Sequence, residues 1–199
     1  MIKDSRRLVA TGYDLIADAY LERFGVSIVR QKWLRRLLDR LPETGGHVLD
    51  LGCGAGIPVA RDLESLGHMV VGVDGSAQQI ARARQNVPRA TFIEGDMCEV
   101  AFAANSFDAV GAFYSITHVP PREQKALIAK IATWLRPGGA LIASFGTGAA
   151  GAWTEEWLGT TMFFGHGGEA EVLKSLTDSG LRIHHTSVDQ QDNEEAEFM

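Results

Sequence analysis

Two patterns of apolar positions alternate along the chain: short continuous runs and stripes at helical spacing. Five runs read as buried strands, at residues 47–51, 69–73, 91–94, 107–113 and 140–145. A more polar run over residues 181–188 is expected to form a last strand. Runs that are apolar on both faces are typical of parallel strands between helical layers, so the pattern predicts an α/β fold.

Helical stripes fill the intervals between these runs. They cover residues 58–66, 76–86, 122–135 and 169–179, and Ser76 is a predicted N-cap. Two more helices precede the first strand and would form an N-terminal helical cap over residues 1–42. The first spans residues 5–24, and the second places these residues on one face: Val26, Val29, Trp33, Leu37 and Leu41. We expect residues 1–199 to form a single domain.

Two stretches lack a clear period. Residues 146–168 are rich in glycine and hold Trp153, Trp157 and Phe164, so we expect a loop that acts as a substrate lid. Packing of these aromatic side chains onto the last helix and strand is the alternative. Residues 190–197 are polar and acidic and are expected to be a mobile end.

The stretch V-L-D-L-G-C-G-A-G, residues 48–56, joins the first strand to the next helix. Glycines at positions 52, 54 and 56 allow a tight turn, and the helix that follows exposes its first N–H groups. Such a turn either binds a nucleotide-like ligand or serves only to reverse the chain. In the dinucleotide fingerprint G-x-G-x-x-G, the third glycine would replace Ile57.

Composition narrows the choice of partners. The 199 residues are 45% hydrophobic and carry a net charge of −6, which disfavours nucleic acid as a partner. No apolar run reaches the roughly 18 residues that a membrane span needs, and no signal peptide is recognisable. Cys53 and Cys98 form neither a disulfide framework nor a metal cluster, and His184-His185 would point to opposite faces of a strand. We expect a cytoplasmic protein without a metal site.

Further motifs follow the glycine turn at regular places. V-V-G-V-D-G-S ends the second strand with Asp74, and E-G-D-M follows the third with Asp96 and Met97. S-F-D-A-V and H-V-P surround the fourth strand, and L-R-P-G-G-A-L-I leads into the fifth. A nicotinamide dinucleotide site would keep Asp74, but it predicts neither the G-D-M stretch nor the R-P-G-G turn.

In this order the motifs resemble those of the class I S-adenosylmethionine (SAM) dependent methyltransferases, in particular the type 11 small-molecule group. The opening Y-D-x-x-A-x-x-Y, from Tyr13 to Tyr20, is similar to the N-terminal helix of that group. The resemblance implies a Rossmann-like parallel sheet with an N-terminal helical cap. Because the chain has only E-F-M where the family's last antiparallel strand begins, that strand is expected to be shortened or missing.

The resemblance also implies which residues bind SAM. Gly52, Cys53 and Gly54 would approach its amino-acid part, with Asp50 ordering the turn from beneath. Asp74 would accept hydrogen bonds from the ribose hydroxyls, as an alternative to a role as a helix cap. The remaining candidates would contact the adenine, the ribose or the methionine part: Val73, Gly75, Asp96, Met97, Phe113, Tyr13 and Tyr20.

Methyl transfer requires that acceptor, methyl group and sulfur be held in line, with a base where the acceptor is protonated. His118, just after the fourth strand, is the first candidate base, and Tyr114 is the second. A structural role for His118 is the alternative. The residues F-Y-S-I stand where nucleic-acid methyltransferases carry N/D-P-P-Y/F, so we expect a small-molecule acceptor at O, N or S. A SAM-binding, non-catalytic regulator and an NAD-type oxidoreductase are the other hypotheses.

Overall fold

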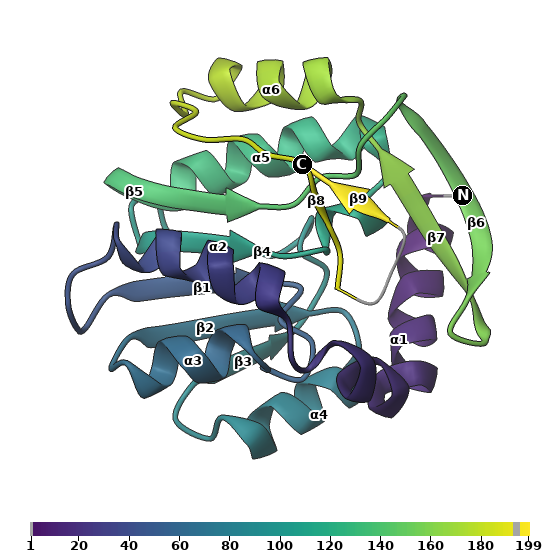
Figure 1. Cartoon of the computed structure of the whole chain (residues 1–199), viewed down its shortest axis with the longest axis horizontal. Coiled ribbons are helices and arrows are strands. Elements are labelled where there is room, and N and C mark those ends of the chain that lie inside the picture. Colours follow the sequence, from purple (N-terminus) through teal and green to yellow (C-terminus); the bar gives the residue numbers. More distant parts are fainter. Residues whose placement is uncertain (1, 193–195) are drawn as a thin grey trace.

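A twisted parallel sheet of five strands forms the centre of the molecule in the computed structural model, which describes residues 2–192 and 196–199 (Figure 1). The strand order is β3-β2-β1-β4-β5, and all four pairings are parallel. The strands span His47–Leu51 (β1), Met69–Asp74 (β2), Thr91–Glu94 (β3), Phe107–Ala112 (β4) and Leu135–Ala143 (β5). The predicted α/β class is confirmed.

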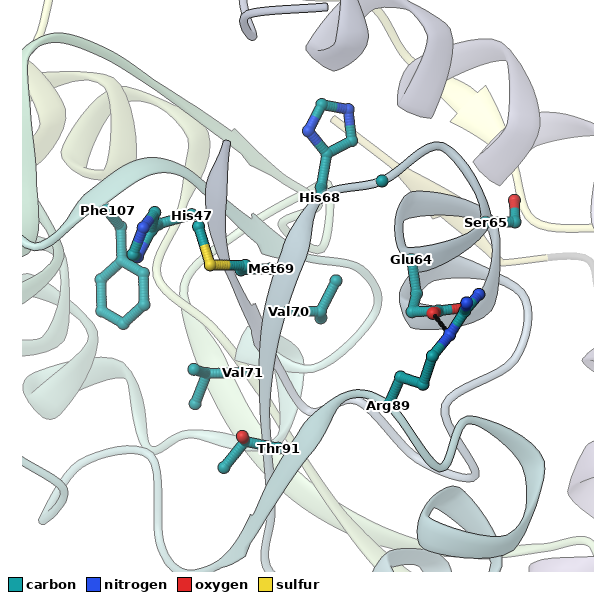
Figure 2. Close-up of a pocket in the computed structure, with 11 residues that line it drawn as sticks. His47, Glu64, Ser65, His68, Met69, Val70, Val71, Arg89, Thr91 and Phe107 are labelled. Atoms are coloured by element: carbon teal, nitrogen blue, oxygen red, sulfur yellow. Dashed lines mark ion pairs between the residues drawn. The ribbon is translucent and has the colours of Figure 1, made fainter. Parts of the chain in front are cut away.

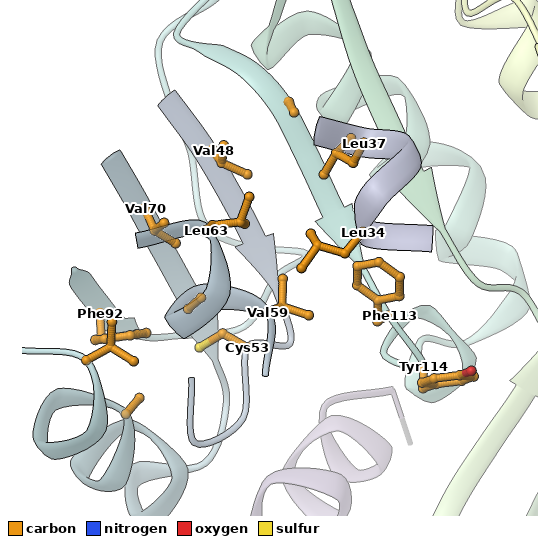
Figure 3. Close-up of a cluster of buried hydrophobic side chains, with 14 of the residues drawn as sticks. Leu34, Leu37, Val48, Cys53, Val59, Leu63, Val70, Phe92, Phe113 and Tyr114 are labelled. Carbon is orange, nitrogen blue, oxygen red and sulfur yellow. The ribbon is translucent and has the colours of Figure 1, made fainter. Parts of the chain in front are cut away.

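Helices cover both faces of this sheet. They span Ile2–Phe24 (α1), Ile28–Leu38 (α2), Val59–Ser65 (α3), Ala77–Asn86 (α4), Pro121–Trp134 (α5) and Glu169–Asp178 (α6), with a 3-10 turn, η1, at Ile116–His118. Helices α2, α3 and α4 pack on one face through a cluster that includes Leu34, Leu63 and Ile80 (Figure 3). Helices α5 and α6 cover the other face, where Ile128 and Val172 are buried.

Helix α1 lies across the carboxyl ends of the strands and is held there by polar contacts with α4. Asp14 Oδ1 accepts hydrogen bonds from Ser76 Oγ (2.6 Å) and from the Gln78 N–H (3.0 Å). Ser76 is also the N-cap of α4, because its Oγ accepts from the Gln79 N–H at 3.1 Å, as predicted. The N-terminal helix therefore covers the carboxyl edge of the sheet.

The buried face of helix α2 is shifted from the predicted one, although Leu37 is buried and Trp33 and Leu41 pack against the core as expected. Val26 is 75% exposed, whereas the buried positions are Arg30, Leu34 and Leu37. Ser27 Oγ caps the helix by accepting from the Arg30 N–H, which fixes where its first turn begins. The interval of four and then three residues is helical, so the phase of the stripe was wrong rather than the helix.

The stretch 146–168, predicted to be a loop, contains an antiparallel hairpin instead. Strands β6 (Gly151–Trp157) and β7 (Thr160–His166) pair along their full lengths. Leu158 and Gly159, both with positive φ, form the two-residue turn that suits the twist of a hairpin. Strand β7 packs against α1, where a Cβ on Gly12 would lie 2.8 Å from Met162 Cε.

The expected strand over residues 181–188 does not form. Only residues 181–184 alternate between apolar and polar, and a strand also needs a hydrogen-bonding neighbour, whereas β5 is the last strand of the described sheet. His184 and His185 are both exposed on this irregular segment, so the prediction of opposite strand faces does not apply. The ring of His185 packs against Trp33.

The C-terminal segment is tied to the rest of the chain, in contrast to the expected mobile end. Strands β8 (Asp189–Gln190) and β9 (Glu197–Phe198) pair antiparallel, and residues 193–195 lie outside the described part. Asp189 accepts from Trp33 Nε1 at 2.9 Å, and Asp192 accepts from the Val29 N–H. Backbone hydrogen bonds join Met199 to Phe145 beyond the end of β5, as a short antiparallel contact.

The R-P-G-G turn expected before the fifth strand lies inside β5 as an irregularity. Residues 136–139 stand opposite the single residue Asp108, between the pairs Phe107–Leu135 and Ala109–Ala140. Arg136 and Asp108 form an ion pair there at 2.6 Å. No helix of the described residues is long and apolar enough to cross a membrane.

Candidate cofactor and acceptor site

The glycine turn after β1 is held by hydrogen bonds from its own N–H groups to the end of β2. The N–H groups of Gly52 and Cys53 donate to the Val73 carbonyl at 2.8 and 3.0 Å. Gly52 has a φ of +73°, and a Cβ there would lie 2.3 Å from Ser115 Cβ, so no other residue fits. A Cβ on Gly54, whose φ is +52°, would meet Gln79 Oε1 at 3.9 Å, an ordinary contact distance.

Asp74 ties this turn to the start of α4. Its Oδ2 accepts from the Gly54 N–H and its Oδ1 accepts from the Ser76 N–H, each at 2.9 Å. Burial raises the pKa of Asp74, although the N–H groups of Ser76 and Gly54 oppose that change. Asp74 is partly buried, and its two oxygens keep lone pairs beyond these hydrogen bonds, so a role toward hydroxyl groups of a ligand stays a prediction. Next to it, Gly75 lies under Ala10 of α1.

Asp50 does not hold the turn as expected. It is 2% exposed, and its Oδ2 has no hydrogen-bond partner among the described residues. Its neighbours in register on β2 and β4 are Gly72 and Gly111, neither of which has a polar side chain. Burial raises the pKa of Asp50 to about 7; Arg30 opposes this shift and Asp74 adds to it. A buried carboxylate without a donor is costly unless a ligand supplies one.

Arg30, on the buried face of α2, is a residue that the sequence prediction missed. It is 5% exposed and donates to the Phe24 carbonyl at 2.9 Å and to the Tyr20 hydroxyl at 2.7 Å. Its guanidinium also lies over the Tyr114 ring, 4.9 Å from the centroid. The signal was its spacing from Leu34 and Leu37, which places a cation on an apolar stripe.

Asp96 is occupied by contacts within the chain. Its Oδ1 accepts from the Cys98 N–H at 2.8 Å, and its Oδ2 pairs with Arg6 Nη1 at 2.5 Å. Arg6 also pairs with Glu99 at 3.0 Å and with Glu123, so α1 is anchored to three carboxylates. Sequence reasoning missed Arg6 because a charged residue near a chain start carries no distinguishing pattern. A role for Asp96 toward adenine stays a prediction.

Met97 is close to the glycine turn. Its Cε lies 3.6 Å from the position that a Cβ on Gly52 would take. The chain therefore brings together the end of β3 and the turn after β1, as a nucleotide site between them requires.

His118 is neutral and fully engaged in hydrogen bonds. Its Nδ1 lies 2.7 Å from the Phe163 carbonyl oxygen, which only accepts, so Nδ1 carries the proton. Its Nε2 then accepts from the Tyr13 hydroxyl at 2.9 Å. Burial lowers the pKa of His118 to about 4, and the Phe163 carbonyl opposes this only in part. The expected imidazole that titrates near neutrality is wrong, and the geometry favours a positioning role.

Tyr114, the second candidate base, is also unsuited to accept a proton. Its ring meets Phe198 edge to face at 4.8 Å and is 7% exposed. Burial raises the pKa of Tyr114 to about 12, despite the opposing charge of Arg30. A group with this pKa stays protonated at neutral pH, so it does not serve as a general base in its ordinary state.

Phe113 and Cys53 are placed in the core on the α2 and α3 face rather than at an open surface (Figure 3). They are 8% and 7% exposed, respectively. For Phe113 this is the plain core role that the sequence left as the alternative, and Cys53 can meet a ligand only through its backbone.

Aromatic side chains from α1 and the hairpin gather beside His118. Trp157 packs against the rings of Tyr13, Tyr20 and Phe24, with centroids 5.9 to 6.1 Å apart. Tyr13 and Tyr20 meet edge to face at 5.3 Å, and Phe164 packs on His118 at 5.0 Å. We call this set the aromatic cluster. It supplies an apolar wall at the same edge of the sheet as the glycine turn.

A pocket of about 490 Å³ lies at the opposite edge of the sheet (Figure 2). It is lined by the first residues of four strands, namely His47, Met69, Thr91 and Phe107. Ligands of open α/β sheets bind outside the carboxyl ends of the strands, so this pocket is on the wrong edge for the cofactor. No group of three or more metal-binding side chains occurs within the described ranges.

Comparison with known proteins decides between the two nucleotides. Residues 48–139, from the glycine turn through β4 and α5, match a family model described as a methyltransferase domain. This match confirms the predicted SAM-dependent methyltransferase domain over these residues. SAM is therefore its cofactor, and the NAD-type interpretation is set aside.

Individual relatives show how far the likeness extends. The chain is 32% identical over 162 residues to the 27-O-demethylrifamycin SV methyltransferase of Amycolatopsis mediterranei, covering 71% of this chain and 59% of that protein. A solved SAM-dependent methyltransferase from Methanosarcina mazei superimposes with a TM-score of 0.71 at 21% identity, covering 82% and 93% of the two chains. The [4+2]-cyclase SpnF has a TM-score of 0.69 at 22% identity, covering 90% and 73%.

The chain spans only about half the length of the curated relatives that it matches, 59% and 42% for two of them. The methyltransferase domain is common to them, whereas the rest of each relative has no counterpart in this alignment. Activity and acceptor are accordingly argued from the site below.

Proposed function

We propose that the chain transfers the methyl group of SAM to an oxygen, nitrogen or sulfur atom of a small molecule. One observation carries the proposal: the carboxylate of Asp74, at the end of β2, holds the Gly54 N–H of the glycine turn and keeps lone pairs for a ligand. The orphaned Oδ2 of Asp50 beneath it fits a cofactor that brings hydrogen-bond donors.

The bound cofactor supplies a methyl group on a sulfonium, which an acceptor lone pair attacks while sulfur keeps the bonding electrons. The chain's task is to bind and orient. Asp74 would accept from the ribose hydroxyls, and Met97 would lie against the adenine. Helix α1, anchored by Arg6 and Asp14, would close over both and exclude water.

The acceptor would lie against the aromatic cluster, with the β6–β7 hairpin as its lid. Support comes from Trp157, which contacts α1 through three rings, and from Phe163, whose carbonyl holds His118. The wall is apolar, which suits a small and partly apolar acceptor.

Neither His118 nor Tyr114 is a proton acceptor at neutral pH. An acceptor that loses its proton without help, such as a thiol, fits this site best. The free thiols of Cys53 and Cys98 fit a reducing, cytoplasmic setting.

A second candidate is a SAM-binding protein that transfers no methyl group. The likeness to a [4+2]-cyclase favours it, because the same fold there carries another activity.

The experiment is a transfer assay with methyl-labelled SAM over a panel of small thiols, phenols, alcohols and amines. We expect labelled product with the wild type and with Arg89→Ala, an exposed residue at the opposite edge. Asp74→Ala should lose at least about tenfold, since it removes hydrogen bonds to a charged group. Binding of SAM without transfer to any acceptor would favour the second candidate. Absence of SAM binding would overturn both.

A further inference from the structure

A chain of hydrogen bonds joins helix α1 to the β6–β7 hairpin through the ring of His118. The Tyr13 hydroxyl, on α1, donates to His118 Nε2 at 2.9 Å. On the other side of the ring, Nδ1 donates to the Phe163 carbonyl, on β7, at 2.7 Å. His118 is 8% exposed, so both bonds are shielded from water. One neutral imidazole thus connects α1, η1 and β7, which lie far apart in the sequence.

The residues on either side of η1 hold the hairpin at a second point and also reach the glycine turn. Gln124, buried on α5, donates from Nε2 to the Val119 carbonyl at 2.9 Å and to the Gly165 carbonyl at 3.0 Å. Just before η1, Ser115 Oγ donates to the Leu51 carbonyl, at the end of β1, at 2.7 Å. The segment around η1 therefore links the turn after β1 to strand β7.

Side-chain packing follows the same route. Helix α1 and strand β7 lie side by side (Figure 1). Phe164 packs on the ring of His118, and Trp157 packs on the ring of Tyr13 with centroids 6.1 Å apart. The outer strand of the hairpin is exposed over residues 151–156, so the hairpin is positioned mainly through β7.

Each of the two elements that meet at His118 covers one part of the proposed site. Helix α1 lies above the end of β2, where Ala10 Cβ is 3.5 Å from the position of a Cβ on Gly75, and the hairpin bounds the acceptor side. If α1 moved away alone, the bond from Tyr13 would break. His118 Nε2 would then be a buried acceptor without a donor, which costs free energy. Joint opening and closing of the two elements avoids this cost.

We propose that His118 is a positioning residue that couples the two elements, so that closure of α1 over SAM also fixes the hairpin against which the acceptor binds. The inference rests on the proposed function, since both elements belong to that site. Cofactor binding therefore orders the acceptor wall before the acceptor arrives. By reciprocity, a bound acceptor strengthens the binding of the cofactor.

Hydrogen–deuterium exchange of the full chain, read by mass spectrometry, tests this coupling without knowledge of the acceptor. Amide exchange is compared with and without S-adenosylhomocysteine, which is SAM without its methyl group. The ligand is added at a concentration that saturates each variant in isothermal titration calorimetry. In the wild type, the ligand should slow exchange both in α1 and in β7.

Tyr13→Phe keeps the ring and removes the hydroxyl that donates to His118. The ligand should still slow exchange in α1, whereas its effect on β7 should fall by about threefold or more, as expected for one lost hydrogen bond. Thr161→Val is the matched control. It removes a hydroxyl hydrogen bond to Glu156 within the hairpin and should keep the wild-type response.

Two substitutions at His118 separate positioning from packing. His118→Phe fills the space without a donor or an acceptor, so the ligand should no longer slow exchange in β7. His118→Gln keeps one donor and one acceptor and should restore at least part of the response. If His118→Phe fails to fold, Tyr13→Phe still provides the test.

The outcomes distinguish this inference from the proposed function. A wild-type response of β7 in Tyr13→Phe would overturn the coupling and leave SAM binding intact. The same holds if the ligand slows α1 but not β7 in the wild type, or if His118→Gln responds no better than His118→Phe. Failure of the wild type to bind S-adenosylhomocysteine would overturn the proposed function, and the inference with it.

Discussion

Two aspartates on neighbouring strands, at opposite edges of the sheet, have opposite environments. Asp108 lies at the amino end of β4, where its Oδ2 accepts from the His47 N–H at 2.8 Å and from Arg136 at 2.6 Å. Burial raises the pKa of Asp108, but Arg136 and the His47 N–H outweigh it and hold the pKa below its usual range. Asp50, at the carboxyl end of β1, has an unpartnered oxygen and a pKa raised to about 7.

The two environments distinguish a structural aspartate from a functional one within the same sheet. At the amino edge the acid is paired by its own chain and stabilises the fold. At the carboxyl edge Asp50 lacks such a partner. The folded state is therefore destabilised by a buried charge that only a ligand neutralises. Sites are often less stable than their surroundings for this reason.

A loss of stability is expected at the paired aspartate. Asp108→Ala removes the ion pair with Arg136 and the hydrogen bond from His47, so the free energy of unfolding should fall by about 1–2 kcal/mol. The lower figure allows for solvent screening of Arg136, which is 38% exposed. Urea denaturation measures the change. Affinity for S-adenosylhomocysteine should be unchanged, and an equal stability of variant and wild type would show that the ion pair contributes nothing.

An effect of opposite sign is expected at Asp50. Its folded pKa, about 7, lies above the value near 4 of the unfolded chain, so the protonated acid is favoured by folding. The contribution of protonated Asp50 to the free energy of unfolding is therefore fully present below about pH 4 and is lost as the pH rises through about 7. Asp50→Asn, which stays uncharged, should be more stable than the wild type at pH 8 by up to about 4 kcal/mol, the value of a rise of roughly three pKa units.

Thermal denaturation of the ligand-free protein between pH 5 and pH 8 measures this difference. The gap between Asp50→Asn and the wild type should widen with pH. A constant gap, or a variant that is less stable at pH 8, would mean that Asp50 has a donor in solution.

Much of the sheet was predictable because its physical signals are local. Strands β1 to β4 are continuous apolar runs, the glycines of the turn are needed for positive φ, and Ser76 is a helix cap. The fold class and the donor of the reaction followed from these features and from the resemblance.

The rest depended on contacts that no local pattern encodes. Residues 181–184 alternate like a strand but have no neighbour to pair with, and Leu158-Gly159 makes a turn without the usual Asn-Gly signal. Whether His118 is a base depends on Tyr13 and Phe163, which lie 105 and 45 residues away. Arg30 was overlooked because a charged residue beside an apolar helical stripe is usually taken to mark the edge of the buried face.

The smallest expected effect concerns the charge of His118. Since its pKa is lowered to about 4, its ring signals in an NMR titration should stay constant from pH 5.5 to pH 8. A midpoint near 6.5 for His118 would contradict its burial and restore it as a candidate base.

The most direct measurement is equilibrium binding of S-adenosylhomocysteine to matched variants of the two edges. Asp74→Ala alters the carboxyl edge, and His68→Ala alters the pocket at the amino edge. We predict one binding site that Asp74→Ala weakens by at least about tenfold and His68→Ala leaves unchanged. Binding that survives Asp74→Ala but is lost in His68→Ala would contradict the placement of the cofactor at the carboxyl edge.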